Sequence, residues 1–162
     1  MTEALRQRIN SLCAAYAKGD FETVQNCLDE DVDFISYAPV EIFPCLGKQQ
    51  GRDAVLSSLK TIHDHFVFLA YDPIFLLAQD EDAALNVMAR LKHRATGRIV
   101  RIIFAQFFRF RDGRIVEFRE FMDSFDAVEQ VLGRHIRVIG GAFAKQEARA
   151  CVDDTGDGAA GC

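Results

Sequence analysis

The chain has 162 residues, of which 49 % are hydrophobic and 27 % charged, and this composition suits one globular domain with a hydrophobic core. Its formal net charge of −5 and the lack of a dense lysine and arginine run argue against nucleic acid or an anionic membrane as the main partner. No apolar run approaches the length of a membrane span, and the N-terminus does not resemble a signal peptide, so we expect a cytoplasmic protein.

The first part of the chain predicts helices around one strand. Apolar residues at helical spacing predict a helix over residues 3–18 and a short helix over residues 21–28. Gly19 suits the end of the first helix, and Asp20 suits the cap of the second. After these helices we expect a strand over residues 32–37, a loop over 40–50 and a third helix over 51–66.

The second part of the chain predicts antiparallel strands followed by a helix. The expected strands cover residues 67–78 and 83–94, and two further strands lie within residues 98–123. The first of them is interrupted at Asp72-Pro73, because proline cannot donate to a sheet hydrogen bond. Thr96-Gly97 predicts a tight hairpin turn, and the motif RDGRI at 111–115 predicts another. Asp123 suits the cap of a last helix, which ends at Gly133.

This order of elements predicts an α+β fold, in which helices cover one face of an antiparallel sheet. We expect residues 1–133 to form one domain and residues 134–162 to form an extension, with no repeats. Within the extension, residues 134–139 suggest a short strand or turn and residues 143–151 a weak helix. Residues 153–162 are rich in Gly, Ala and Asp, which is typical of a flexible segment.

The two long strands have one face that is almost wholly apolar. Alternate residues fall on this face, and its only polar members are Gln106 and Glu120. The expected turns place Phe104 opposite Glu120 and Ala89 opposite Phe104, so these three residues would form one row across three strands. Gln106 would then lie diagonally from Glu120, within reach of its side chain.

The other face of these strands is apolar in its middle and charged at its ends. An apolar centre with a charged rim suggests the interface of a homodimer. The residues that we expect in this interface are Met88, Ile103, Ala105, Phe107, Arg119 and Phe121. The alternative is that the C-terminal tail covers this face.

No metal or other cofactor is expected. The five cysteines are scattered and form no C-x-x-C pair, which favours reduced thiols over disulfides or a zinc site. They are Cys13, Cys27, Cys45, Cys151 and Cys162. His63 and His65 lie two residues apart on a predicted helix, so their side chains diverge. The sequence contains no phosphate loop, nucleophile elbow or Rossmann glycine pattern.

Three motifs carry a resemblance to a known family. They are the helix pair broken at Lys18-Gly19-Asp20, the segment Gly51-Arg52-Asp53-Ala54-Val55, and DGRIVEFREFMDSFD at 112–126. Over residues 5–133 the chain resembles the nuclear transport factor 2-like superfamily, and within it the SnoaL-like and ketosteroid isomerase-related proteins. The resemblance implies a cone, in which a curved antiparallel or mixed sheet wraps around three N-terminal helices and a C-terminal helix follows. Family members include isomerases, polyketide cyclases, dehydratases, a small epoxide hydrolase and pure binding domains.

Two sets of catalytic residues known in this family are incomplete here. The ketosteroid isomerases have an aspartate base near the end of the first strand, whereas this chain reads Phe34-Ile35-Ser36-Tyr37 there. The limonene-epoxide hydrolase type has an arginine and an aspartate that correspond to Val87 and Ala89. Its third catalytic residue, an acid on the last strand, corresponds to Glu120. Only this one of the three catalytic residues is therefore matched.

Glu120 is the first catalytic candidate, because apolar surroundings disfavour its charged form and suit it to general acid–base work. The alternative is a hydrogen-bonded glutamate in the pocket wall that takes part in no chemistry. Gln106 is expected to orient Glu120 or a ligand carbonyl, unless it is only a satisfied core amide. Tyr37 is a candidate for polarising a substrate carbonyl, although its position favours core packing. The expected substrate-binding wall comprises Val87, Ala89, Leu91, Ile102, Phe104, Phe108, Phe118 and Met122.

Three functions are compatible with these features. The first is a cofactor-independent enzyme of the proton-transfer, isomerase, cyclase or hydration type that acts on a small hydrophobic molecule. The second is a non-catalytic domain in which Glu120 anchors a ligand. The third is a dimeric scaffold whose interior is filled by its own side chains, a possibility supported by the 14 phenylalanines.

Overall fold

The computed structural model describes residues 2–136, which fold into four helices and six strands. In chain order the elements are α1 (Thr2–Lys18), α2 (Phe21–Cys27), β1 (Leu28–Ser36), β2 (Lys48–Gln50), α3 (Arg52–His65), β3 (Phe66–Gln79), β4 (Asp82–His93), β5 (Ile99–Arg111), β6 (Arg114–Met122) and α4 (Ser124–Leu132). The segments predicted at 143–151 and 153–162, and the second half of the one at 134–139, lie outside the described residues.

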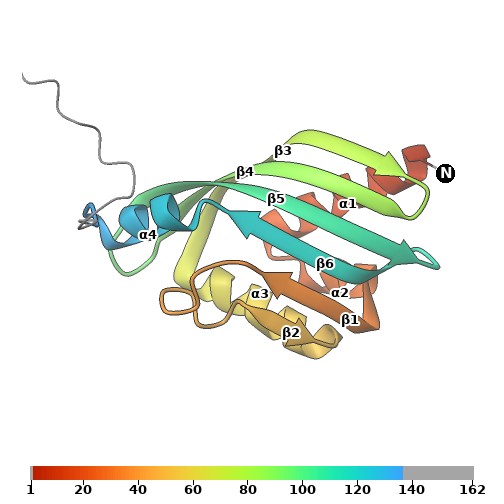
Figure 1. Cartoon of the computed structure of the whole chain (residues 1–162), viewed down its shortest axis with the longest axis horizontal. Helices are drawn as coiled ribbons and strands as arrows, with labels where there is room; N and C mark the ends of the chain where they lie inside the picture. The colour runs from red at the N-terminus through yellow and green to blue at the C-terminus, as the bar shows by residue number, and fades with distance from the viewer. Residues whose placement is uncertain (1, 137–162) are drawn as a thin grey trace, which may run out of the picture.

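The six strands form one mixed sheet in the order β2-β1-β6-β5-β4-β3. Strands β1 and β6 run parallel, and every other neighbouring pair is antiparallel. Figure 1 shows α1, α2 and α3 together behind the sheet, and α4 at one end of it. There the Gln130 side chain of α4 exchanges hydrogen bonds with the backbone of Arg101 in β5. The α+β class that the sequence predicts is therefore confirmed.

Short polar side chains cap the helices where the sequence predicts them. Asp20 accepts a hydrogen bond from the Thr23 amide at 3.1 Å, and Asp123 accepts one from the Asp126 amide at 3.0 Å. At the end of α4, Gly133 adopts the left-handed conformation with φ of 66°, which glycine adopts without steric cost. These local signals place both helix starts correctly.

The expected loop over residues 40–50 contains a strand that the sequence pattern did not indicate. Strand β2 is only three residues long, and its Gln50 pairs with Asp33 of β1. Its residues are polar and lie at the edge of the sheet, so they show no alternation of apolar and polar positions. The prediction of a continuous loop was wrong for this reason.

The hairpin between β4 and β5 has a longer turn than predicted. The His93 amide donates to the Arg98 carbonyl and the Gly97 amide donates to the His93 carbonyl, so residues 94–97 form a four-residue loop. This loop moves the register by two residues from the one expected for a Thr96-Gly97 turn. Ala89 pairs with Ile102 instead of Phe104, and Val87 takes the place opposite Phe104.

The hairpin between β5 and β6 also differs from the expected register. Asp112 and Gly113 both have positive φ, 50° and 75°, and form a two-residue turn instead of the expected three-residue turn. A bulge then shifts the ladder, since Phe110 pairs with Ile115 and Arg109 pairs with Glu117. The predicted row of Ala89, Phe104 and Glu120 is therefore wrong. Gln106 lies directly opposite Glu120.

The inner and outer faces of the sheet have the character that the sequence predicts. On β5, Ile102 and Phe104 are buried, whereas Ile103 and Phe107 are about half exposed, at 56 % and 48 %. The core lies between the inner face and helices α1–α3. Its largest fully buried side chains are Ile9, Val24, Leu28, Val32, Phe34, Val55, Val87, Val100 and Ile115. No helix within residues 2–136 is long and apolar enough to cross a membrane.

Candidate functional site

Glu120 lies in the middle of the inner face, between two polar neighbours on adjacent strands. In the sheet ladder it pairs with Gln106 of β5 on one side and with Ser36 of β1 on the other. All three residues are buried, with exposed fractions of 9 % for Glu120 and 2 % for each of the others. The antiparallel and parallel pairings therefore bring one acid, one amide and one hydroxyl into a single row.

A chain of hydrogen bonds connects this row to a tyrosine of β3. The Ser36 hydroxyl donates to Oε1 of Glu120 at 2.9 Å, and Nε2 of Gln106 donates to Oε2 at 2.8 Å. The same Nε2 donates to the Tyr71 hydroxyl oxygen at 2.9 Å. Both N–H groups of the amide are then in use, and the hydroxyl hydrogen of Tyr71 remains available to another acceptor.

Glu120, Gln106 and Tyr71 line a cavity of about 70 Å³ between the sheet and the helices. The polar groups in its wall are the Glu120 carboxyl, the Gln106 amide, the Cys13 thiol and the hydroxyls of Tyr16 and Tyr71. Six members of the expected wall do line the cavity, namely Leu91, Ile102, Phe104, Phe108, Phe118 and Met122. The other two expected members, Val87 and Ala89, are fully buried in the core and do not line it.

Burial dominates the electrostatics of this cavity. It raises the pKa of the Glu120 carboxyl, although the hydrogen bonds from Gln106 and Ser36 act in the opposite direction. Burial and the nearby carboxylate of Glu120 raise the pKa values of the Tyr16 and Tyr71 hydroxyls well above their ordinary value. Both phenols are therefore neutral hydrogen-bond donors at pH 7, while Glu120 ionises closer to neutrality than a surface glutamate.

Tyr37 lies outside this cavity. The residue is 52 % exposed, and its ring stacks on Phe121 of β6 with the ring centroids 4.4 Å apart. The residue touches the site only through its backbone, whose amide donates to the Glu120 carbonyl at 2.8 Å. The tyrosine hydroxyl that bonds Gln106 in this cavity belongs to Tyr71 of β3.

Sequence reasoning missed three polar residues of the site: Ser36, Tyr16 and Tyr71. Tyr16 shares one helical face with Leu5, Ile9 and Leu12, and this spacing is the signal that could have found it. Tyr71 belongs to a strand whose ladder shifts between Phe68 and Ala70 and again after Pro73, so simple alternation does not assign its face. Ser36 meets Glu120 through the parallel pairing of β1 with β6, which no turn in the sequence indicates.

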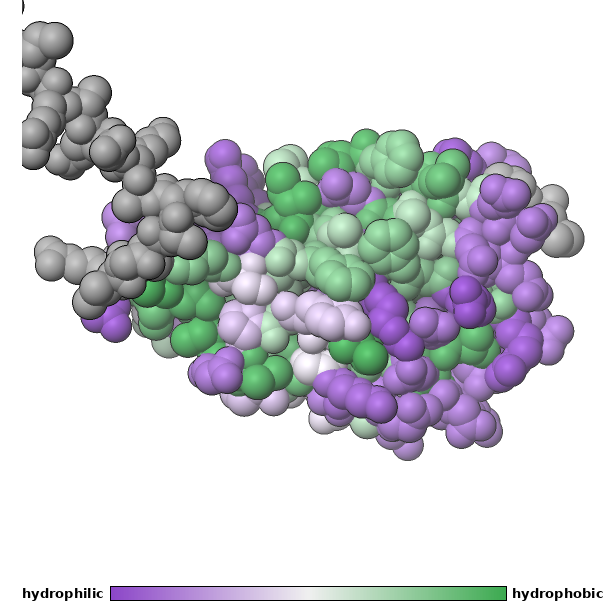
Figure 2. All heavy atoms as spheres, viewed as in Figure 1, coloured by the Kyte–Doolittle hydropathy of each residue, from purple (hydrophilic) through white to green (hydrophobic). Residues whose placement is uncertain are grey.

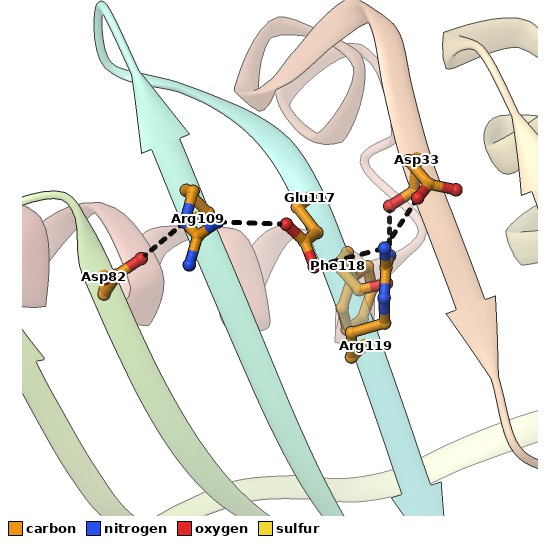
Figure 3. A network of polar contacts seen from close by, with 6 residues as sticks. All are labelled: Asp33, Asp82, Arg109, Glu117, Phe118 and Arg119. Atoms are coloured by element: carbon orange, nitrogen blue, oxygen red, sulfur yellow. Dashed lines mark hydrogen bonds and ion pairs between the residues drawn. The ribbon is translucent and has the colours of Figure 1, made fainter.

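The charged residues of the same strands lie on the opposite face of the sheet. Figure 3 shows a ladder of ion pairs that crosses β4, β5, β6 and β1. Its members, in order, are Asp82, Arg109, Glu117, Arg119 and Asp33. At its buried end, Nη1 of Arg119 also donates to the backbone oxygen of Asp33 at 2.7 Å, which ties β6 to β1. No group of three or more potential metal ligands occurs within residues 2–136.

Comparisons with known proteins agree with this fold. Residues 9–118 match the SnoaL-like domain family. A search of curated proteins finds no match. A candidate isomerase from Rhodopseudomonas palustris has 32 % sequence identity and a TM-score of 0.75, and the match covers 83 % of this chain and 100 % of that one.

Two more distant structures share the fold alone. An LEH-like epoxide hydrolase from M. tuberculosis has 17 % identity and a TM-score of 0.67, with 82 % of this chain and 92 % of that chain covered. TerC, which was crystallised with polyporic acid, has 14 % identity and a TM-score of 0.70, with 79 % and 98 % covered. Relatives of this fold therefore include an enzyme and a protein crystallised with a small organic molecule.

Proposed function

Since the chain belongs to the SnoaL-like domain family, we propose that it is a cofactor-independent enzyme that moves a proton on a small apolar carbonyl compound. Isomerases, cyclases and hydration enzymes share this step. One observation carries the proposal. Glu120 is buried in an apolar cavity whose described wall contains no lysine, arginine or histidine, and the pKa of its carboxyl is raised. A carboxyl group in this state suits general acid–base catalysis near neutral pH.

Each polar group of the cavity has a distinct part in this reaction. The Glu120 carboxylate takes a proton from the carbon next to the carbonyl, and the electron pair moves to the carbonyl oxygen. The Tyr71 hydroxyl donates a hydrogen bond to that oxygen as its negative charge develops. Gln106 holds both groups at a fixed separation through its two N–H bonds. Glu120 then returns the proton to the same or another carbon, which completes the transfer.

Hydrogen exchange on a simple ketone tests this function without knowledge of the natural substrate. Cyclohexanone is incubated with the protein in D2O, and loss of its α-proton signal is followed by NMR. We expect Glu120→Gln to lower the rate by at least about 100-fold, as loss of a general base usually does. Tyr71→Phe should lower it less, and the matched control Tyr37→Phe should leave it unchanged. Exchange by Glu120→Gln at the rate of the unmodified protein would refute the role of Glu120.

A second candidate function is the non-catalytic binding of a very small ligand, because the cavity leaves little room for a reacting substrate. The volume of about 70 Å³ is less than half of the roughly 150 Å³ of an engineered cavity that binds benzene. A ligand must therefore be slim, or the half-buried rim residues Leu12, Leu59 and Ile62 must move aside. A ketone that raises the melting temperature without exchanging its protons would support this candidate over catalysis.

We also propose that the outer face of the sheet is the interface of a homodimer. In Figure 2 hydrophobic residues gather over the middle of this face, and hydrophilic residues border it. Ile103, Phe107 and Phe121 are exposed there by 56 %, 48 % and 41 %. The rings of Phe107 and Phe121 contact each other there, with centroids 5.9 Å apart, so these side chains form a patch and are not scattered singly. The charged ladder that begins at Asp82 and Arg109 forms one border of it.

Two other expectations stay predictions. The free thiols of Cys13, Cys27 and Cys45 support a reducing compartment, and we therefore propose a cytoplasmic location. The division into a domain of residues 1–133 and an extension of residues 134–162 follows from composition alone.

A further inference from the structure

The cavity that holds Glu120 contains an acid and no base. Among the described residues of its wall, Glu120 is the only one with a charged form at neutral pH. The remaining polar groups are two phenols, one amide and one thiol, none of which forms an ion pair with a carboxylate. A positive charge inside this cavity therefore has to come from a ligand.

The arginine next to Glu120 in the sequence does not supply that charge. Arg119 precedes Glu120 in β6, and strand alternation turns its side chain to the outer face. There its Nη2 lies 2.6 Å from Oδ2 of Asp33 and 3.1 Å from Oε1 of Glu117. Figure 3 shows the guanidinium of Arg119 between these two acids. Its charge is thus already paired on the far side of the sheet.

The Glu120 carboxylate keeps acceptor positions for a ligand. Each of its oxygens accepts one hydrogen bond from the described residues, Oε1 from Ser36 and Oε2 from Gln106. A carboxylate offers about four acceptor positions, so about two remain. An ammonium group carries N–H donors that fit these positions, and a charged donor forms the stronger hydrogen bond.

Aromatic rings surround the polar end of the cavity. The ring centroid of Tyr16 lies 5.1 Å from that of Phe68 and 5.4 Å from that of Tyr71. The ring of Tyr71 is in turn 6.4 Å from Phe104. The faces of such rings attract organic cations through their quadrupole. A carboxylate and a cluster of aromatic rings are the two features that together stabilise an organic ammonium ion in an apolar site.

We propose that this cavity binds small apolar amines in their protonated form, with the ammonium group on Glu120 and the hydrocarbon part against the phenylalanine wall, and that it excludes carboxylates of the same size. The inference rests on the cavity of the proposed function and adds cations to its ligand class. A saturated amine has no carbonyl through which to react, so it competes with the ketone for the same space.

The pH dependence of amine binding identifies the group responsible. The other titratable groups around Glu120 are Tyr16 and Cys13 of α1, His63 of α3, Tyr71 of β3 and Cys45 of the loop between β1 and β2. Burial raises the pKa of both phenols and both thiols, that of Cys13 to about 12, so all four stay neutral up to pH 8. Burial lowers the pKa of His63, which is therefore neutral at pH 7 and above. Between pH 7 and pH 8 amine affinity should thus follow the ionisation of Glu120, and below pH 7 the variant Glu120→Gln separates this effect from protonation of His63.

Three probes with the same ring test the proposal on the full chain: cyclohexylamine, cyclohexanone and cyclohexanecarboxylate. Their dissociation constants are measured by NMR titration between pH 5 and pH 8, where the amine stays protonated. At pH 8 we expect the amine to bind at least about tenfold more tightly than the carboxylate, and to weaken toward pH 5. Glu120→Gln should weaken the amine about tenfold and change the ketone less than about twofold.

Glu117→Gln is the matched control, because it removes the same charge three residues away on the outer face. It should leave amine binding unchanged. Equal binding of amine and carboxylate, or amine binding that ignores both pH and Glu120→Gln, would overturn the proposal. If Glu120→Gln does not fold, the order of the three probes on the unmodified protein at pH 7 and pH 8, where His63 is neutral, decides the same question. Selective amine binding without α-proton exchange of cyclohexanone would refute the enzymatic function alone. Proton exchange without a preference for the amine over the carboxylate would refute this inference alone.

Discussion

Glu120→Gln should make the protein more stable at neutral pH, even though it removes the main polar group of the site. Burial raises the pKa of the Glu120 carboxyl above its value in the unfolded chain. Between these two pKa values the folded protein binds more protons than the unfolded one, so the free energy of unfolding falls as pH rises. Glutamine has the same shape as glutamate and cannot ionise. In the variant, the free energy of unfolding therefore no longer falls with pH because of this residue.

The size of the effect is limited by one proton, which corresponds to about 1.4 kcal/mol for each pH unit inside the window. The pH window in which ionisation of Glu120 lowers stability begins near 4.5, the ordinary pKa of a glutamate carboxyl. Its width is reduced by the hydrogen bonds from Ser36 and Gln106, since bonds to a charged group contribute about 1.5–3 kcal/mol each. We expect the advantage of the variant to grow with pH inside this window, by at most about 1.4 kcal/mol for each unit, and to level off above it.

Urea unfolding at a series of pH values, followed by circular dichroism, measures this difference. The protein concentration is held constant, because dimer formation would change the apparent stability. Glu117→Gln serves as the control, since it removes an outer-face carboxylate and should show no comparable gain with pH. A difference between Glu120→Gln and the unmodified protein that stays the same at pH 5 and pH 8 would refute the reasoning, because it would mean that Glu120 is not destabilised by ionisation.

Three further predictions address the neighbours of Glu120, the outer face and a helix end. Ser36→Ala removes a hydrogen bond that favours the ionised carboxyl, so the pH midpoint of cyclohexanone exchange should move upward, while Ser36→Thr should keep it in place. Phe107→Asp puts a charge in the centre of the apolar outer face and should halve the mass measured by light scattering, whereas Val40→Asp in the exposed loop should not. Gly133→Ala forces a Cβ into left-handed backbone and toward Arg98, and should cost about 1–2 kcal/mol in urea unfolding.

Features decided by neighbouring residues could be predicted from the sequence. The caps at Asp20 and Asp123 and the stop at Gly133 depend on backbone groups within a turn of the residue itself, so local chemistry suffices. The two faces of β5 follow from strict alternation, which places Gln106 and Phe104 inward whatever they pair with.

The pairing of strands could not be predicted to the same precision, for a physical reason. A slip of one residue moves every side chain to the opposite face, and the hydrophobic pattern forbids it. A slip of two residues keeps every side chain on its face and leaves the pattern unchanged. Both hairpins differ from expectation by two residues at the site, so Glu120 was placed on the correct face but opposite Phe104 instead of Gln106. The loop at residues 94–97 sets the register of β4 and β5, and the turn at residues 112–113 together with the bulge at Arg109 and Phe110 sets that of β5 and β6.

The isolation of Glu120 is a consequence of strand parity. Arg119 and Glu120 are consecutive in β6, and an arginine on the inner face would pair with the carboxylate and lower its pKa. Alternation instead sends Arg119 to the outer face, where Asp33 and Glu117 compensate its charge. Arg119 also holds β1 in the register that presents Ser36 to Glu120, because it bonds both the backbone and the carboxylate of Asp33. The charge of Arg119 is thus compensated on the outer face, whereas that of Glu120 is not compensated by the protein. Glu120 faces the cavity, where a ligand can supply the positive charge.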